Sequence, residues 1–535
     1  MNRWVFLYIL SIVAIAFYHF LPIGIVGEVS AMWGVVPHTI QNTETWQMGP
    51  ISSVGICELQ TTRPLVFCHI ADWNIPISLN VYTPSVLDWP NALVYQMFPS
   101  PTTIRLLQYT MCVLATMWIG FLLLPHLQKP SGYIYIALFT SDWVYLFYKK
   151  ALGNTEIALQ IAIVLLGVSL LTEGKNTHKF AIVGICIGML AKITFVVCVI
   201  PFLLIHIYKL RTDRRNISHT IFWIYAYIAI LLCASIPNIC TSIWVAKHQQ
   251  DILVYSHDFW DMQWQRVSMA IQGQVTSARE NHDNIWLWLL DPLPFFHTAY
   301  GVAENLLNTK LAVYGKCLGY LGCAIAACKT PTNIRWTKIA PISAFLLLSS
   351  LLLALVAKDM HHLAMLTPIL WFCVVSIVDT STLQPKWKYT LCLVLLVANL
   401  DILWRSPTII NSVGTPTFAE HQQESLRDFL AKNHVRNLIT MDYEIYGVLE
   451  VIAPDIQSTH LWPAISAERN NALPHIIQQA SQGNHLLVLR SSQAMMYNLQ
   501  PSLEKLQSIA GTTQIELVDS IPNQVWLYRV TANTH

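Results

Sequence analysis

Four charged residues lie close together in an otherwise apolar part of the sequence: Asp142, Lys149, Lys150 and Glu156. They join two apolar runs, 133–148 and 156–172, that are each long enough to cross a bilayer. We therefore expect the cluster at one membrane face, where charge is usually functional. Ammonium groups can hold phosphate, and a carboxylate can orient or deprotonate a hydroxyl group. The alternative is that both lysines extend to lipid headgroups and the acids are solvated.

The composition indicates a polytopic α-helical membrane protein. Of the 535 residues, 54% are hydrophobic and only 12% are charged, which is too apolar for a soluble protein of this length. The net charge of +2, without a basic tract or a Gly-rich phosphate loop, argues against a nucleic-acid-binding protein. The first apolar run, 4–26, is longer than a signal-peptide core, so we expect it to be a retained helix.

The distribution of lysine and arginine predicts the membrane topology. The apolar runs lie at 4–26, 105–124, 133–148, 156–172, 180–207, 220–246, 311–328, 339–357, 362–378 and 389–404. Basic residues gather in alternate short loops, which should be cytoplasmic. The run 180–207 has basic segments on both sides, so we predict two short helices that turn near Lys192; one long tilted helix is the alternative. The result is about eleven membrane helices, with the N-terminus inside and the C-terminus outside.

This topology leaves three long segments on the outer face: 27–104, 247–310 and the tail after residue 405. Cys57 and Cys68 lie in the first segment, where they form either a disulfide in an oxidising compartment or two free thiols. The second segment is rich in Trp and His. This composition favours a helix that lies in the membrane interface; a sugar-binding surface is the alternative.

The tail, 406–535, changes character because its charges are regularly spaced and turn residues return. We predict helices at 418–433 and near 500–509, and a further helix after the first strand. The predicted strands lie at 437–441, 485–490, 515–521 and 525–530. Alternating helices and strands indicate a small soluble α/β domain. The glycines here lack the G-x-G-x-x-G spacing of a dinucleotide site.

Two function classes fit a charged outer face. A transporter or flippase of lipid-linked sugars requires polar groups at mid-membrane and related halves. Here the membrane spans are almost free of charge, and no internal repeat is evident. An enzyme acting on a lipid phosphate requires cations for the phosphate and a carboxylate for the acceptor, all on one face. The sequence favours the enzyme.

Four stretches carry a family resemblance: "IPISLNVYTPSVLDWPNALVYQMFPSPTTIRLL" (75–107), "SDWVYLFYKKALGNTEIALQ" (141–160), "GICIGMLAKITF" (184–195) and "KDMHHLAMLTP" (358–368). In their order and sidedness they resemble the GT-C superfamily of polyprenyl-phosphate-sugar-dependent glycosyltransferases, among them the bacterial ArnT-like and PMT-like membrane proteins of glycosyltransferase family 39. The resemblance covers roughly residues 1–405 and extends loosely into the tail at 439–454. It implies a GT-C transmembrane domain at 1–405 and a periplasmic α/β domain at 406–535, in the inner membrane of a bacterium.

The resemblance also implies catalytic carboxylates. In the family, an acidic residue of the first outer loop, often one of a pair, acts as the base or orients the acceptor. Here Glu28 stands without a paired acid, so the base is left open among Glu28 and the other acids of this loop, which are Glu44, Glu58, Asp72 and Asp88. Asp142 matches a family carboxylate that binds a divalent metal or a sugar hydroxyl. If Mg²⁺ or Mn²⁺ is used, Glu28 and Asp142 would hold it together with the donor phosphate.

The donor phosphates require cations, because negative charge grows on the leaving group in the transition state. The candidates are Lys149, Lys150, Lys192, His361, His362 and Arg105. His361 and His362 could bind phosphate as imidazoles, or they could only mark the membrane interface. Arg105 could instead anchor the start of its helix. Glu156 opens a helix and is explained by the helix dipole.

The resemblance therefore predicts an inverting membrane glycosyltransferase that uses a polyprenyl-phosphate or polyprenyl-diphosphate sugar. The acceptor lies outside the cytoplasmic membrane. The candidate acceptors are a protein such as a pilin, a glycolipid such as lipid A, and a surface polysaccharide. A non-catalytic scaffold with the same fold is a further alternative, because the acidic pair is missing.

Overall fold

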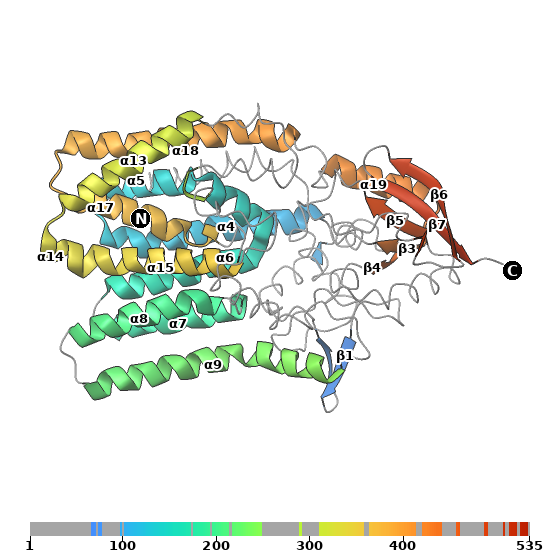
Figure 1. Ribbon diagram of the computed structural model, residues 1–535, viewed down its shortest axis with the longest axis horizontal. Helices are drawn as coiled ribbons and strands as arrows, with labels where there is room; N and C mark the ends of the chain where they lie inside the picture. Colours follow the sequence, from blue (N-terminus) through green and yellow to red (C-terminus); the bar gives the residue numbers. More distant parts are fainter. Residues whose placement is uncertain are drawn as a thin grey trace.

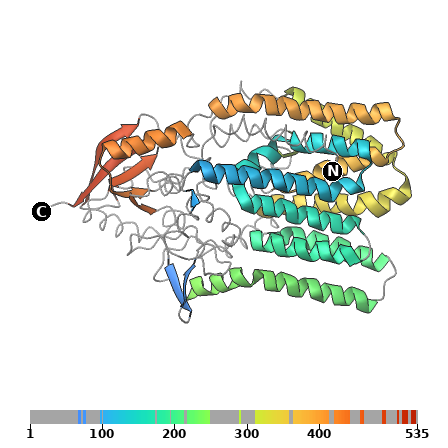
Figure 2. The same ribbon diagram turned by 180° about the vertical axis from the view of Figure 1, so that it is seen from behind.

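The computed structural model describes residues 66–70, 73–77, 97–98, 101–172, 175–192, 195–212, 217–248, 288–290, 310–357, 363–412, 420–440, 456–460, 486–490, 507–508, 513–521 and 525–532. Most of these residues form a bundle of long helices that run side by side (Figures 1 and 2). The helices of the bundle are α4 (Pro101–Leu123), α5 (Lys129–Thr140), α6 (Trp143–Leu171), α7 (Lys175–Ala191), α8 (Val196–Thr212), α9 (Ile217–His248), α13 (Lys310–Cys328), α15 (Ala340–Ala357), α17 (Thr367–Thr380) and α18 (Pro385–Ser412). Short turns η3 (Leu124–His126), α14 (Thr332–Ile334) and η6 (Arg335–Ile339) complete it.

By length and composition, three described helices could cross a membrane: Lys310–Cys328, Thr332–Ala354 and Pro385–Arg405. Five shorter apolar helices accompany them, within α4, α6, α7, α9 and α17. The total of about eleven membrane helices stays a prediction, because the first apolar run lies outside the described residues.

Helices α4, α6, α8 and α17 end at one end of the bundle, which we call the basic end. Helices α5, α7, α9 and α18 begin there (Figure 1). Two basic side chains bind helix ends here. Lys209 donates to the carbonyl oxygens of Leu170 and Thr172, at the end of α6, and Arg335 donates to those of Cys328 and Thr330, at the end of α13. A cation at a helix C-terminus satisfies carbonyl groups that have no partner within the helix.

The run 180–207 is two helices, as predicted. Helix α7 ends at Ala191 and α8 begins at Val196, with Lys192 in the turn. The amide of Lys192 donates to the carbonyl oxygen of Gly188 at 2.9 Å, and the amide of Phe195 donates to that of Lys192 at 2.9 Å. The Phe195 ring lies so close to Gly188 that a Cβ atom there would overlap it. The turn therefore needs glycine at position 188.

The predicted boundary between the runs 133–148 and 156–172 was wrong. The break comes earlier, at Ser141 and Asp142, and α6 then continues through Lys149, Lys150 and Glu156 without interruption. Gly153 and Asn154 lie inside α6, because each of these residues costs a helix only about 1 kcal/mol or less. The surrounding alanine, leucine and lysine residues favour helix. The four charges therefore lie along one helix and its start rather than in one connection.

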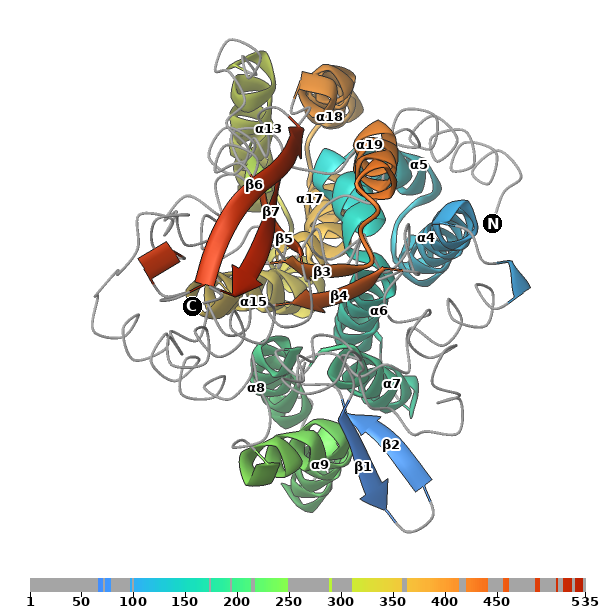
Figure 3. The same ribbon diagram turned by 90° about the vertical axis from the view of Figure 1, so that its right-hand side faces the viewer.

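Helix α17 lies in the middle of the bundle (Figure 3), and 11 of its 14 residues are buried. It packs against α5, α6, α13 and α15. The peripheral helix α9 instead exposes Phe222, Tyr225 and Leu232. Such an apolar outer surface suits contact with lipid.

The end opposite to the basic end carries the strands (Figures 1 and 3). A hairpin of β1 (Val66–Ile70) and β2 (Trp73–Ile77) lies in the first long segment and was not predicted. A five-stranded sheet has the order β4-β3-β5-β7-β6, from β3 (Asn437–Thr440), β4 (Gln457–His460), β5 (Leu486–Arg490), β6 (Thr513–Ile521) and β7 (Val525–Ala532). Strand β3 is parallel to β4 and β5, while β7 is antiparallel to β5 and β6.

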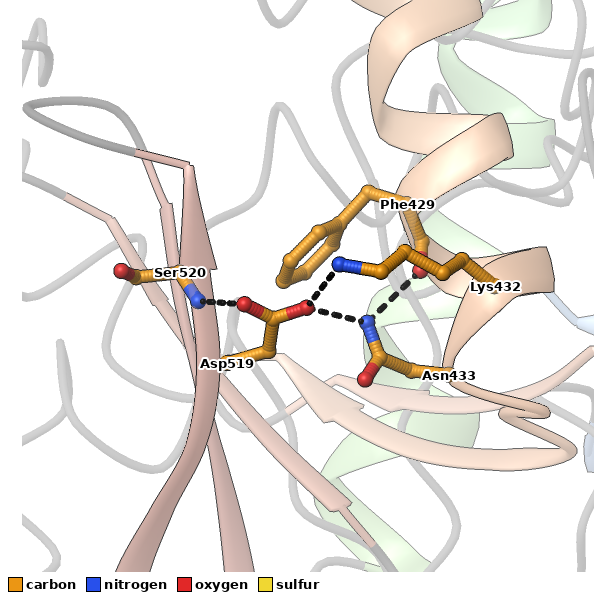
Figure 4. A network of polar contacts seen from close by, with 5 residues as sticks. All are labelled: Phe429, Lys432, Asn433, Asp519 and Ser520. Carbon is orange, nitrogen blue, oxygen red and sulfur yellow. Dashed lines mark hydrogen bonds and ion pairs between the residues drawn. The ribbon is translucent and has the colours of Figure 1, made fainter.

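Four strands of this sheet lie where the sequence pattern placed them: β3, β5, β6 and β7. Strand β4 was missed because its sequence, QSTH, lacks apolar alternation. Helix α19 (Glu420–Lys432) covers the sheet through Leu426, Phe429 and Leu430, which pack with Leu438 and Leu527. Polar contacts join α19 to β6: Lys432 and Asn433 both donate to Asp519 at 3.0 Å, and the Asp519 carboxylate also accepts from the amide of Ser520 (Figure 4).

Candidate active site

Asp142 lies in the break between α5 and α6, at the level of Asn399, which is about midway along α18. It directly precedes Trp143, the first residue of α6, and Asp is favoured at this N-cap position. The preceding helix α5 ends at Thr140, and the hydroxyl of the next residue, Ser141, donates to the carbonyl oxygen of Leu138 at 3.2 Å. Asp142 is only 3% exposed. A carboxylate is thus held inside the protein at a helix break, where burial makes its interactions stronger than in water.

Trp371 orients this carboxylate. Its indole Nε1 donates to Oδ2 of Asp142 at 2.9 Å, and its ring is fully buried in the second turn of the central helix α17. A hydrogen bond to a charged acceptor is about twice as strong as one between neutral groups. Trp371 therefore fixes the direction in which Asp142 presents its second oxygen.

Helix α18 fixes the same break from another side. The amide nitrogen Nδ2 of Asn399 donates to the carbonyl oxygen of Leu138 at 3.1 Å and lies 3.4 Å from the hydroxyl of Ser141. Asn399 is buried. Its amide is a second donor to this carbonyl group at the end of α5, which also accepts from the Ser141 hydroxyl. The position of Asp142 is thus set by three helices: α5, α17 and α18.

A short described part of the second long segment packs against α13 and α17. The indole of the buried Trp288 donates to the hydroxyl of Thr367 at 3.1 Å, and Tyr320 of α13 donates to the carbonyl oxygen of Leu289 at 3.1 Å. The Tyr320 phenol also lies within electrostatic range of Asp142. Tyr320 therefore connects this segment to the neighbourhood of the buried carboxylate.

The whole chain is similar to solved structures of a bacterial membrane protein. The structure of ArnT from Cupriavidus metallidurans bound to undecaprenyl phosphate matches with a TM-score of 0.58 at 10% identity, over 99% of this chain and 98% of that one. The apo state of the same protein matches with a TM-score of 0.56 at 8% identity, over 98% and 97% of the two chains. The chain has the ArnT fold. This finding confirms the fold that the GT-C resemblance predicted, and such a fold implies a membrane protein. Neither a protein-family model nor a curated protein sequence matches the chain.

Within the ArnT fold, the predicted cations are distributed over several elements. Lys149 and Lys150 lie in the second turn of α6, and Arg105 lies in the second turn of α4. Lys192 is half-buried in the turn between α7 and α8. Their assignment to donor phosphates stays a prediction.

Several predicted residues lie outside the described part of the chain: Glu28, Cys57, His361 and His362. Cys68 is in β1, opposite Ile75, but its side chain is not described. The disulfide between Cys57 and Cys68 and the metal pair of Glu28 and Asp142 therefore stay predictions. Among the described residues, no three His, Cys, Asp or Glu side chains could hold a metal ion together.

Sequence reasoning missed three buried polar residues near the site: Trp371, Asn399 and Lys316. The first two look like ordinary residues of an apolar helix, and no sequence signal marks them. Lys316 did carry a signal, because it is a lysine inside the apolar run 311–328. It lies on the face of α13 that turns toward the protein.

A second buried polar cluster lies in the half of the bundle nearer the basic end, on helices α7, α8 and α9. Nδ1 of His178 lies 2.7 Å from the Tyr227 hydroxyl, which lies 3.2 Å from Nε2 of His206. The three residues come from α7, α9 and α8, and His178 stacks on Trp223 with ring centroids 3.7 Å apart. This cluster joins three neighbouring helices and is separate from the candidate active site.

Proposed function

We propose that this chain is an integral membrane glycosyltransferase that transfers a sugar from a polyprenyl-phosphate or polyprenyl-diphosphate donor to an acceptor outside the cytoplasmic membrane. The observation that supports it best is the buried, oriented carboxylate of Asp142 in a chain with the ArnT fold. One solved protein of this fold binds undecaprenyl phosphate. Such a lipid presents its phosphate at the membrane surface, at the level of the bundle end.

The proposed reaction is a displacement at the anomeric carbon of the donor sugar. An acceptor hydroxyl loses its proton to a carboxylate, and its oxygen forms a bond to the anomeric carbon. The bond from this carbon to the phosphate oxygen breaks, and the electron pair leaves with the lipid phosphate. Attack from the face opposite to the leaving group inverts the configuration. Glu28 is proposed as the base, and Asp142 as the group that orients the acceptor or the sugar.

The proposed cations act on the leaving group. Negative charge develops on the phosphate oxygen as the bond breaks, so ammonium groups near it stabilise the transition state more than the ground state. Lys149, Lys150 and Lys192 are proposed for this role, with Arg105, His361 and His362 as further contributors. A divalent cation between Glu28 and Asp142 is a separate proposal. Loss of transfer on addition of EDTA, restored by Mg²⁺ or Mn²⁺, would support it.

The acceptor and the compartment are also proposed. We place the chain in the inner membrane of a bacterium, with the α/β tail 406–535 in the periplasm. The acceptor is a periplasmic protein such as a pilin, a glycolipid or a surface polysaccharide. The position of the tail suggests that it recognises a protein acceptor. Deletion of 414–535 with unchanged protein glycosylation would contradict this role.

The test is an intact-mass comparison of periplasmic proteins and glycolipids from cells with and without the chain. We expect a mass increase of one sugar on one acceptor class, absent in the variants Asp142→Asn and Glu28→Gln. Retained transfer in both variants would remove the site assignment. A transporter or flippase would instead change the side on which the lipid-linked sugar is found, and a scaffold would change neither quantity.

A further inference from the structure

Lys316 is among the most deeply buried large side chains of the described residues, with 2% of its surface exposed. It lies on α13, whose two faces are clearly different. One face exposes Leu311, Tyr314, Leu318, Leu321 and Ile325, and the other buries Ala312, Lys316, Gly319, Cys323 and Ala326. The spacing of both sets follows the helical period. The lysine therefore occupies an inward position where an apolar residue would fit, while the outward face suits lipid.

The position of Lys316 along α13 places it at the level of the candidate active site. Lys316 lies 12 residues before Cys328, where α13 ends at the basic end, which is about 18 Å along the axis at a rise of about 1.5 Å per residue. Asp142 lies just after the 12-residue helix α5, which begins at the same basic end. The two residues therefore lie at a similar level along the bundle.

The neighbours of α13 are the elements that build the candidate active site. The helix packs against α17, which carries Trp371, and against α18, which carries Asn399. Tyr320, one turn after Lys316 on the same helix, binds the Leu289 carbonyl and lies within electrostatic range of Asp142. Lys316 and Asp142 therefore border the same part of the protein interior.

A lysine inside a membrane helix is unfavourable. Lysines in such places are rare, usually face the interior of the bundle and mark the pathway of a substrate or an ion. An ammonium group has three donors and can share them between a protein oxygen and a phosphate oxygen. We propose that Lys316 binds a phosphate oxygen of a lipid phosphate in the candidate active site. This inference rests on the proposed function and adds a residue that the sequence motifs did not indicate.

The test measures the binding of decaprenyl phosphate to the full-length chain, purified in detergent. Affinity is obtained from the increase in the thermal unfolding midpoint of the protein as the ligand concentration rises. The variant Lys316→Met keeps a long side chain and removes the charge, and Lys316→Arg retains it. Lys310→Met is the matched control, because Lys310 lies on the same helix and is exposed. We expect Lys316→Met to weaken binding at least tenfold, Lys316→Arg to recover most of it, and Lys310→Met to leave it unchanged.

Two further ligands identify what is bound. Decaprenol, which lacks the phosphate, should bind weakly and equally to all variants. Inorganic phosphate should compete only at concentrations far above those of the lipid; equal affinity for it would overturn the assignment to a lipid headgroup. Wild-type affinity of Lys316→Met for decaprenyl phosphate would overturn the inference. A structural role of Lys316 predicts a different result: Lys316→Met would have a lower unfolding midpoint without ligand and would lose equal affinity for decaprenyl phosphate and decaprenol. That result would also overturn the inference.

Sugar transfer measured on the same proteins separates this inference from the proposed function. Wild-type chain that binds decaprenyl phosphate through Lys316 but transfers no sugar would contradict only the enzyme proposal. Transfer that Lys316→Met leaves unchanged, in both KM for the donor and kcat, would contradict only the role of Lys316.

Discussion

The indole of Trp371 and the carboxylate of Asp142 are joined by a buried hydrogen bond of 2.9 Å, although 229 residues separate them in the chain. The bond ties the central helix α17 to the break between α5 and α6. A hydrogen bond to a charged group contributes about 1.5–3 kcal/mol. Its loss would leave a buried carboxylate with a less defined orientation.

Trp371→Phe should therefore impair sugar transfer while the protein stays folded. Phenylalanine retains an aromatic ring but has no donor for Asp142. We expect kcat/KM for the donor to fall about 10- to 100-fold, from the strength of a hydrogen bond to a charged group. The measurement is the initial rate of transfer from a polyprenyl-phosphate sugar by the purified chain.

The control for this variant is Trp387→Phe. Trp387 lies at the start of α18, near the basic end, and is 56% exposed. Its replacement should leave kcat/KM unchanged. Equal rates for Trp371→Phe and wild type would show that the orientation of Asp142 does not limit the reaction.

The sequence predicted those parts of the fold that follow from local rules. The alternation of basic loops required a turn near Lys192, and α7 and α8 do separate there. The site depended on non-local contacts, which a single sequence does not reveal. Trp371 and Asn399 reach Asp142 and its helix break from α17 and α18, yet in the sequence they look like other residues of apolar helices. The break itself was misplaced because the charges Lys149, Lys150 and Glu156 were interpreted as a connection between two apolar runs, although lysine and glutamate favour helix.

Gly188→Ala should destabilise the turn between α7 and α8. A Cβ atom at this position would overlap the ring of the buried Phe195. Overpacking of this kind typically costs about 1–3 kcal/mol. We expect a lower thermal unfolding midpoint in detergent. We also expect weaker donor binding, because the displaced turn carries Lys192.

Gly120→Ala is the matched control. Gly120 is also a helical glycine, but a Cβ atom there would meet only Leu124, at an ordinary distance of 3.9 Å. Alanine favours helix over glycine by about 0.5–1 kcal/mol, so the midpoint should be unchanged or higher. A similar fall in both variants would mean that the Phe195 contact is not the cause.

Tyr227→Phe should lower stability without changing catalysis. The variant removes the hydroxyl that lies between His178 and His206 and leaves two buried ring nitrogens without this partner. Leaving buried polar groups unsatisfied costs about 1–3 kcal/mol. The unfolding midpoint should fall, while kcat for sugar transfer below that temperature should equal the wild-type value.

Tyr225→Phe tests whether the hydroxyl itself is responsible. Tyr225 precedes Tyr227 by two residues on α9, but it is 68% exposed on the outer face. Its variant should keep the wild-type midpoint. A fall in kcat of Tyr227→Phe would instead connect the cluster to catalysis.

The stability of the tail should depend on pH through Asp519. The amide of Asn433, the ammonium group of Lys432 and the backbone amide of Ser520 stabilise the ionised carboxylate and lower the pKa of Asp519 from 3.8 to about 2. A lowered pKa means that the folded tail binds this proton less readily than the unfolded tail. The contribution to stability is therefore fully present above about pH 4 and is lost as the pH falls toward 2.

Hydrogen exchange of peptides from β6 and β7, corrected for the intrinsic effect of pH, measures this loss in the full chain. We expect protection in the wild type to fall between pH 4 and pH 2. Asp519→Asn should show lower protection at neutral pH and a smaller dependence over this range. Asp428→Asn, at an exposed position of α19, should keep the wild-type profile. Asp519 accepts the hydrogen bonds from Lys432 and Asn433 that join the end of α19 to β6. Identical dependence of protection on pH in Asp519→Asn and the wild type would therefore contradict its role in linking helix and sheet.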